Sequence, residues 1–247
     1  MNPDDLSQRL SRIATHWSMV LEAHGDAAEE SRSARRHLIE NYNRSVYRYL
    51  LGAVRDANAA EELAQEFALR LLRGDFHRVN PSRGRFRDYI KTVLSNLVKD
   101  HFRSRQRRPR ALAETAAAEV PDSSAAVAPT IEDCLREDVL ARTWDSLKRT
   151  QPRYHLVLLL RAEHSDLSSE EMAERLLATA GGNWSALQVR KTLERARARF
   201  ADLLLDEVKA TLQCTTLDDL GSALEELKVL RYCRAALERR AGSESGS

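Results

Sequence analysis

Cysteine is scarce in this chain of 247 residues, and its placement excludes two kinds of stabilised small fold. The three cysteines, Cys134, Cys214 and Cys233, are odd in number, lie far apart in the sequence and form no C-x-x-C pair. Such spacing supports neither a disulfide framework nor a zinc site, so we expect a protein that works in a reducing compartment.

Glycine, proline and long apolar runs are also rare. The chain has only 9 Gly and 6 Pro, while Leu, Ala, Arg and Glu dominate, and this composition favours helices over strands. The first residues, MNPDDLSQRL, contain acidic side chains and no apolar signal-peptide core, and no apolar run approaches the roughly 20 residues that span a bilayer. We expect an all-α protein that is cytoplasmic and has no membrane contact.

The motifs of common nucleic-acid enzymes are absent as well. The sequence has no P-loop, no G-x-S-x-G, no H-x-E with paired cysteines and no cluster of carboxylates suited to two metal ions. The seven histidines are scattered. We therefore expect a protein that is not an enzyme, with no catalytic residue, metal or cofactor.

Positive charge, in contrast, is concentrated in one segment. The formal net charge is only +2, yet residues 83–110 contain ten Arg or Lys and two Asp. This segment carries +8, and the rest of the chain, with 29 basic and 35 acidic residues, carries −6. Such segregation of charge is typical of a protein that binds a polyanion.

Changes in composition predict two helical domains with additions at both ends. Residues 109–130, PRALAETAAAEVPDSSAAVAPT, are rich in Ala, Ser and Pro and predict a flexible linker. The expected parts are an N-terminal amphipathic helix within 1–30, a first domain over 31–108, a linker over 109–133, a second domain over 134–208, and a helical extension with a disordered tail over 209–247.

The basic segment predicts a helix over about residues 85–105. Phe86, Ile90, Val93 and Leu97 recur at helical spacing and predict a buried face, whereas Arg87, Lys91, Lys99 and Arg103 follow a different face. Such a helix could hold phosphates while aromatic side chains receive unstacked bases. A solvated basic surface is the simpler alternative.

The segment DANAAEELAQEFALRLLR predicts a preceding helix, with Asn58 as its N-cap. Its apolar face, with Ala60, Leu63, Phe67 and Leu71, leaves a mostly acidic stripe of Glu62, Gln65, Glu66 and Leu69. Because acidic charge repels DNA, the stripe is better suited to another protein, although it could also be merely solvated.

Two helices in the second domain begin with the same local pattern. LSSEEM and WSALQV each place a serine N-cap (Ser168, Ser185) three residues before Glu171 or Gln188, which predicts two capping boxes. A glycine turn separates the helices, and the second helix has a basic face. The pattern favours a DNA-binding helix-turn-helix over an ordinary helical hairpin.

The order of EELAQEFALRLL, RGRFRDYIKTVLSNLVKDHFRSRQRR, a Pro/Ala linker and a capped pair of helices ending in RKTLERARARFADLL resembles a known family. The chain is similar to bacterial RNA polymerase sigma factors of the two-domain, extracytoplasmic-function (ECF) group, here with a C-terminal extension. The resemblance covers about residues 35–108 and 134–205.

The resemblance implies a transcription initiation factor whose partners are promoter DNA and the clamp coiled coil and flap of core RNA polymerase. It assigns polymerase binding to Glu62, Gln65, Glu66 and Leu69. It assigns recognition and melting of the minus-ten element to Arg85, Phe86, Arg87, Tyr89, Lys91, Asn96, Lys99, Asp100 and Arg103. It assigns reading of the minus-thirty-five element to Ser185, Gln188, Arg190, Lys191, Arg195 and Arg197.

The chain departs from the family at four places, one of which is an additional N-terminal helix with Trp17. Tyr89 stands where members often carry Trp, the turn LATAGGNWS is longer than usual, and residues 209–240 extend past the usual end, with a leucine stripe from Leu217 to Leu230. The extension could regulate the protein by folding back, or an anti-sigma or other partner could do so. The stripe could instead form the dimer interface of an alternative protein, a helix-turn-helix regulator that acts without polymerase.

Overall fold

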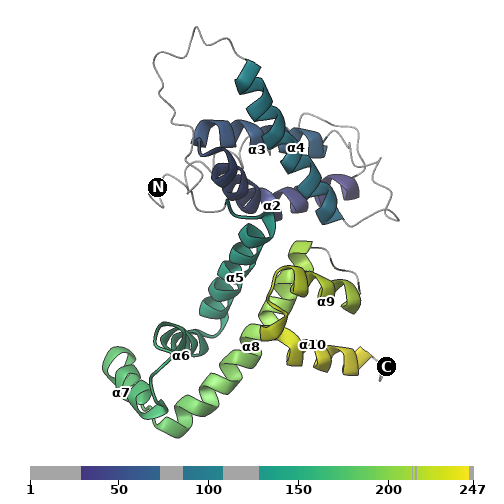
Figure 1. Cartoon of the computed structure of the whole chain (residues 1–247). Coiled ribbons are helices and arrows are strands. Elements are labelled where there is room, and N and C mark those ends of the chain that lie inside the picture. Colours follow the sequence, from purple (N-terminus) through teal and green to yellow (C-terminus); the bar gives the residue numbers. More distant parts are fainter. Residues whose placement is uncertain (1–28, 73–85, 108–127, 213, 215, 245–247) are drawn as a thin grey trace, which may run out of the picture. The chain divides into compact units, whose positions relative to one another are not determined.

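The computed structural model describes residues 29–72, 86–107, 128–212, 214 and 216–244, and every element in these ranges is an α-helix (Figure 1). The all-α prediction is confirmed. The expected N-terminal helix and most of the expected linker lie outside the described residues. None of the described helices combines the length and apolar character needed to cross a membrane. The chain divides into two compact units, Met1–Leu135 and Arg136–Ser247, each described by itself.

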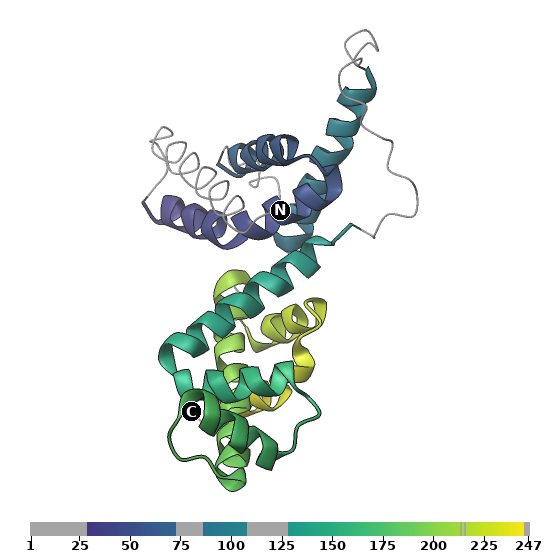
Figure 2. The same cartoon turned by 90° about the vertical axis from the view of Figure 1, so that its left-hand side faces the viewer.

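The first unit is built on three helices, α2 (Glu29–Val54), α3 (Ala57–Leu72) and α4 (Phe86–Arg107). Figure 2 shows α3 running beside α2, and α4 packs against both. The core comes from side chains at helical spacing on each helix, and its largest fully buried members include Tyr47, Leu50, Phe67, Ile90 and Leu94. Burial of these large apolar groups is what fixes the outward faces of α3 and α4.

The start of α3 differs from the sequence-based prediction. Asn58 is not the N-cap, because the Oδ1 atom of Asp56 accepts hydrogen bonds from the backbone N–H groups of Asn58 (2.9 Å) and Ala59 (3.1 Å). These bonds favour the charged carboxylate, and they lower the pKa of Asp56, with the Ala59 bond as the largest cause. The helix therefore begins two residues earlier than Asn58 would allow. Leu63, which was expected to be buried, is only partly so, and Ala64 takes its place in the core.

The second unit is organised along one long helix, α8 (Ala186–Leu212). Its first half packs against α6 (Pro152–Glu163) and α7 (Ser169–Ala180), with Val157, Met172, Leu176 and Val189 in the shared core. Its second half packs against α9 (Leu217–Glu226) and α10 (Leu230–Glu244). The extension predicted after residue 208 thus shares a core with α8. Figure 1 shows α9 and α10 beside the second half of α8.

Helix α5 (Ile131–Thr150) contributes its later residues to the second unit. Trp144 stacks at a tilt on Phe200 with 4.9 Å between ring centroids. Arg142 forms an ion pair with Glu207 and donates a 2.8 Å hydrogen bond to the hydroxyl of Thr211. These contacts hold α5 against the middle and the end of α8.

Candidate nucleic-acid interface

The acidic stripe of α3 lies on the side of the helix that faces away from the core. Glu62 is exposed, and Gln65, Glu66 and Leu69 are partly exposed. Glu66 accepts a 2.8 Å hydrogen bond from the Nε atom of Arg70, one turn further along. The structure therefore brings the four predicted side chains onto one accessible surface, whose negative charge Arg70 partly offsets.

Helix α4 separates an apolar face from a polar one, as the sequence predicted. Ile90, Leu94 and Leu97 are at most 2% exposed. Asn96, Lys99, Asp100 and Arg103 are all exposed, and their spacing of three or four residues aligns them along the helix. Asp100 and Arg103 form an ion pair of 3.5 Å between side chains that are 60% and 68% exposed. A pair so exposed is weak and could readily exchange Asp100 for a phosphate.

Part of the predicted minus-ten set cannot be placed at the level of side chains. Arg85 lies outside the described residues, and Phe86, Arg87 and Tyr89 belong to the first turn of α4, where side chains are not described. Sequence reasoning also passed over Phe102, which is 41% exposed and lies between Lys99 and Arg103 in the polar half of the helix. The signal was its position off the apolar stripe, which is the place for an aromatic side chain that stacks on bases.

Lys91 is a described member of the set whose charged partner lies outside the set. Its ammonium group forms an ion pair with Glu132, and the two side chains are 39% and 24% exposed. Glu132 is the second residue of α5, within the first unit, and it was not anticipated because it lies about 40 residues away in the sequence. A cation held in this way must leave its carboxylate before it can contact a phosphate.

The segment that carries Glu132 has a capped helix start, buried side chains and a close approach to α2. Thr130 and Asp133 cap the helix reciprocally, with a 3.2 Å bond from the Thr130 amide and a 3.1 Å bond from the Asp133 amide. Ile131, Cys134 and Leu135 are at most 5% exposed. At Gly52, an added Cβ would lie 2.6 Å from Cδ of Pro129, so this glycine permits the close approach of the segment to α2.

A half-buried tyrosine, Tyr49, is affected by the charge of the same carboxylate. The pKa of the Tyr49 phenol is raised, first by burial and then by the negative charges of Glu132 and Cys134. Both causes oppose formation of the phenolate. Tyr49 therefore stays neutral at ordinary pH and adds no charge that would compete with the Lys91–Glu132 pair.

In the second unit, both predicted capping boxes are present. At α7 the Ser168 amide donates to Oε2 of Glu171 (2.7 Å), and the Glu171 amide donates to Oγ of Ser168 (3.2 Å). The first of these bonds is the main cause of the lowered pKa of Glu171. At α8 the Ser185 amide donates to Oε1 of Gln188 (3.0 Å), and the Gln188 amide donates to Oγ of Ser185 (3.3 Å). The local pattern alone fixed these two helix starts.

The turn between α7 and α8 contains two glycines and is held by contacts of the Trp184 side chain. Gly181 and Gly182 have φ values of 64° and 83°, in the left-handed region that side chains disfavour. The indole N–H of Trp184 donates to the Gly181 carbonyl at 3.1 Å, and the guanidinium carbon of Arg153 lies 4.3 Å from the Trp184 ring centroid. Arg153 was missed because a cation–π contact between distant residues leaves no local sequence signal.

The outward face of α8 carries the predicted basic residues. Val189, Leu193 and Ala196 are buried, whereas Gln188, Arg190, Lys191, Arg195 and Arg197 are exposed, as is the cap residue Ser185. Because Oε1 of Gln188 is used in the cap, its amide NH₂ group is the part left for another partner. Leu187, in the first turn, is 54% exposed and was not in the predicted set.

Among the described residues, no group of three or more His, Cys, Asp or Glu side chains could hold a metal ion. Comparison with curated proteins gave no match, and comparison with solved structures gave none either. One comparison did succeed, and its match lies within the first unit. Residues 38–108, which include most of α2 and the whole of α3 and α4, match the family model for sigma-70 region 2.

Proposed function

We propose that this protein is a sigma factor of the two-domain ECF group with a C-terminal extension. It would act in the cytoplasm without covalent chemistry, binding core RNA polymerase and directing it to promoters. The observation that carries the proposal is the match of residues 38–108 to sigma-70 region 2, together with the exposed polar face of α4 within that match.

The α3 stripe is the proposed polymerase contact. Glu62, Gln65, Glu66 and Leu69 lie on one accessible side and combine negative charge with one apolar group. Such a surface suits the clamp coiled coil of core polymerase, and its charge repels DNA, so the two partners of the first unit would occupy different helices.

The polar face of α4 is the proposed site of minus-ten recognition and melting. Lys99 and Arg103 would contact phosphates, Asn96 would contact a base edge, and Phe102 would stack on a base together with the aromatic residues at the start of the helix. Unstacking costs a few kcal/mol per step, and each base–aromatic stack returns about 1–3 kcal/mol. Stacking and phosphate contacts together would offset this cost.

The second unit is the proposed reader of the minus-thirty-five element. Helices α7 and α8, joined by the glycine turn, would act as a helix-turn-helix that inserts the start of α8 into the major groove. Arg190 and Lys191 lie near that start and are suited to base edges, whereas Arg195 and Arg197 lie further along and are suited to phosphates. The same unit would meet the polymerase flap.

In vitro transcription with purified core polymerase on genomic fragments tests the proposal. RNA should start at defined sites only when the chain is added. Arg103→Ala should reduce open-complex formation while leaving polymerase binding intact, and Glu62→Lys should weaken polymerase binding itself. Failure of the unmodified chain to support any start site would refute the proposal.

The competing function, a DNA-binding regulator that acts without polymerase, needs a dimer interface. The sequence offered the leucine stripe of residues 217–230 for that purpose. Leu220, Leu224 and Leu227 are at most 2% exposed, because they pack inside the second unit. Tight binding of the isolated chain to a palindrome would nevertheless favour the regulator, whereas copurification with core polymerase would favour the sigma factor.

A further inference from the structure

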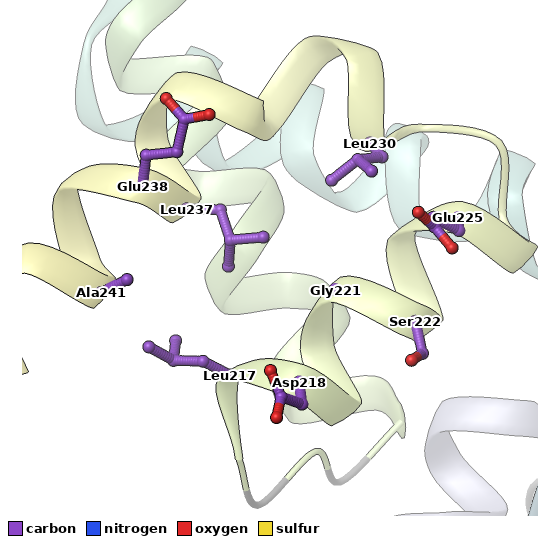
Figure 3. A pocket seen from close by; sticks show the side chains of 9 residues that line it. All are labelled: Leu217, Asp218, Gly221, Ser222, Glu225, Leu230, Leu237, Glu238 and Ala241. Carbon is purple, nitrogen blue, oxygen red and sulfur yellow. The ribbon is translucent and has the colours of Figure 1, made fainter.

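A groove of about 420 Å³ lies between α9 and α10, in the C-terminal extension of the second unit. Three leucines, Leu217, Leu230 and Leu237, line it, and each is only partly buried. Figure 3 shows their side chains at the space between the two helices. A set of partly exposed, large apolar groups on one concave surface is a typical docking site for a helix.

A glycine keeps this groove open. Gly221 lies inside α9, where glycine weakens a helix, and its φ angle is not in the left-handed region. An added Cβ would make ordinary contact with Leu237, at 3.7 Å from Cδ2, so packing does not require glycine there. The effect of Gly221 is to leave space beside Leu237 that a side chain would fill.

The groove also has a distinctive charge. Asp218, Glu225 and Glu238 line it and are exposed, and none of the three has an ion-pair partner within the described part of the chain. Where α10 faces α8, Arg239 of α10 forms an ion pair with Asp202 of α8 at 3.1 Å, and Arg240 of α10 forms one with Asp206 of α8 at 2.8 Å. Two of the four basic residues of α10 are thus used on the α8 side, and the residues that line the groove include three carboxylates and no Lys or Arg.

We propose that this groove binds an amphipathic helix of a protein partner, with leucine-sized side chains on one face and lysine or arginine beside them. The apolar face would cover Leu217, Leu230 and Leu237, and the cations would meet Asp218, Glu225 and Glu238. Helix α9 has 10 residues and is about 15 Å long, which accommodates roughly three turns of a bound helix.

The same chemistry argues against other occupants. Nucleic acid is repelled by three carboxylates. A second copy joined by twofold symmetry would place the same acidic groove against itself, so like charges would meet. The proposal does not depend on the proposed function, because binding can be measured without polymerase or DNA.

The probe is a fluorescein-labelled peptide of about 18 residues, long enough to form a helix, with leucines on one face and lysines flanking them. A twin peptide carries glutamates in place of the lysines. Fluorescence anisotropy with the full chain should show binding of the lysine peptide only. The double variant Glu225→Lys/Glu238→Lys should weaken that binding at least about tenfold.

A matched control reverses two exposed carboxylates elsewhere in the same unit. Glu163→Lys/Glu174→Lys makes the same change in net charge and should leave peptide affinity within about twofold. Gly221→Leu fills the groove without adding charge and should also weaken binding at least about tenfold, with an unchanged or higher melting temperature. If Gly221→Leu fails to fold, Gly221→Ala and the charge reversals still give the answer.

Three results would overturn the proposal. The lysine peptide could fail to bind, both peptides could bind alike, or both double variants could lose the same affinity. Light scattering can give a fourth result that overturns the proposal. If the unmodified chain is a dimer and the Glu225→Lys/Glu238→Lys variant is a monomer, the occupant of the groove is a second copy of the chain.

Discussion

Replacing Glu132 with glutamine should strengthen binding of single-stranded DNA by the first unit. In the structure Glu132 holds the ammonium group of Lys91, a proposed contact of the minus-ten strand. The variant keeps the size and polarity of the side chain and removes only its charge. Lys91 then no longer has to leave a carboxylate before it meets a phosphate.

The size of the effect follows from the exposure of the pair. With side chains 39% and 24% exposed, solvent screens the attraction. Partly exposed pairs of this kind contribute about 0.2–1 kcal/mol, which corresponds to a gain in affinity of roughly 1.4- to 5-fold. The helix start should survive, because Thr130 and Asp133 form the cap without Glu132.

Fluorescence anisotropy with a labelled single strand at low salt measures this gain, and a double-mutant cycle isolates its cause. Lys91→Met should weaken binding, and Glu132→Gln should have little further effect when added to Lys91→Met. Glu163→Gln, which removes one exposed charge in the other unit, is the control and should change affinity less. If Glu132→Gln strengthens binding equally with and without Lys91, the carboxylate acts through general charge and the reasoning fails.

Three further predictions concern the second unit. Leu187 is exposed at the start of α8 and should contact the methyl group of a thymine in the upstream element. Replacing that thymine with deoxyuridine should lower the DNA affinity of the unmodified chain about fourfold and that of Leu187→Ala hardly at all. An equal loss of affinity in both proteins would exclude the contact. The hydrogen bond from the Ser168 amide lowers the pKa of Glu171 in the folded protein. The cap therefore stabilises the fold fully at pH values above the ordinary pKa of 4.5, and this stabilisation is lost as the pH falls through the lowered pKa of the folded state. Urea unfolding should therefore show a difference between the unmodified chain and Glu171→Ala at pH 7 that shrinks toward pH 3, and a constant difference would contradict the assignment. Burial raises the pKa of Cys233 to about 12, so mass spectrometry should find this thiol unmodified by iodoacetamide at pH 8 until the chain is unfolded; rapid labelling of the native protein would show that the site opens.

The sequence predicts a structural feature correctly when the contacts that form the feature join residues close together in the chain. The boxes at Ser168 and Ser185 involve partners three residues apart, so the pattern determined them correctly. At α3 the choice of Asn58 was wrong, because the carboxylate of Asp56, two residues earlier, accepts hydrogen bonds from two backbone amides. The sequence alone did not distinguish which of two nearby polar residues forms the cap.

Contacts between distant residues were not predictable in the same way. Nothing in the basic segment indicates that Lys91 meets Glu132, and nothing near Trp184 indicates Arg153. The leucine stripe of residues 217–230 was visible as a pattern, yet periodicity does not say what covers it. The structure shows that α8 and α10 bury most of its members.

The length of α8 gives the second unit a mechanical property. Its 27 residues form a helix of about 40 Å, which packs at one end against α6 and α7 and at the other end against α9 and α10. A tilt of about 5° imposed on the far end would move the tip that bears Leu187 by roughly 3 Å, about the length of one hydrogen bond. A helix that enters the acidic groove would therefore be in a position to shift the opposite tip, the proposed DNA-reading end of α8.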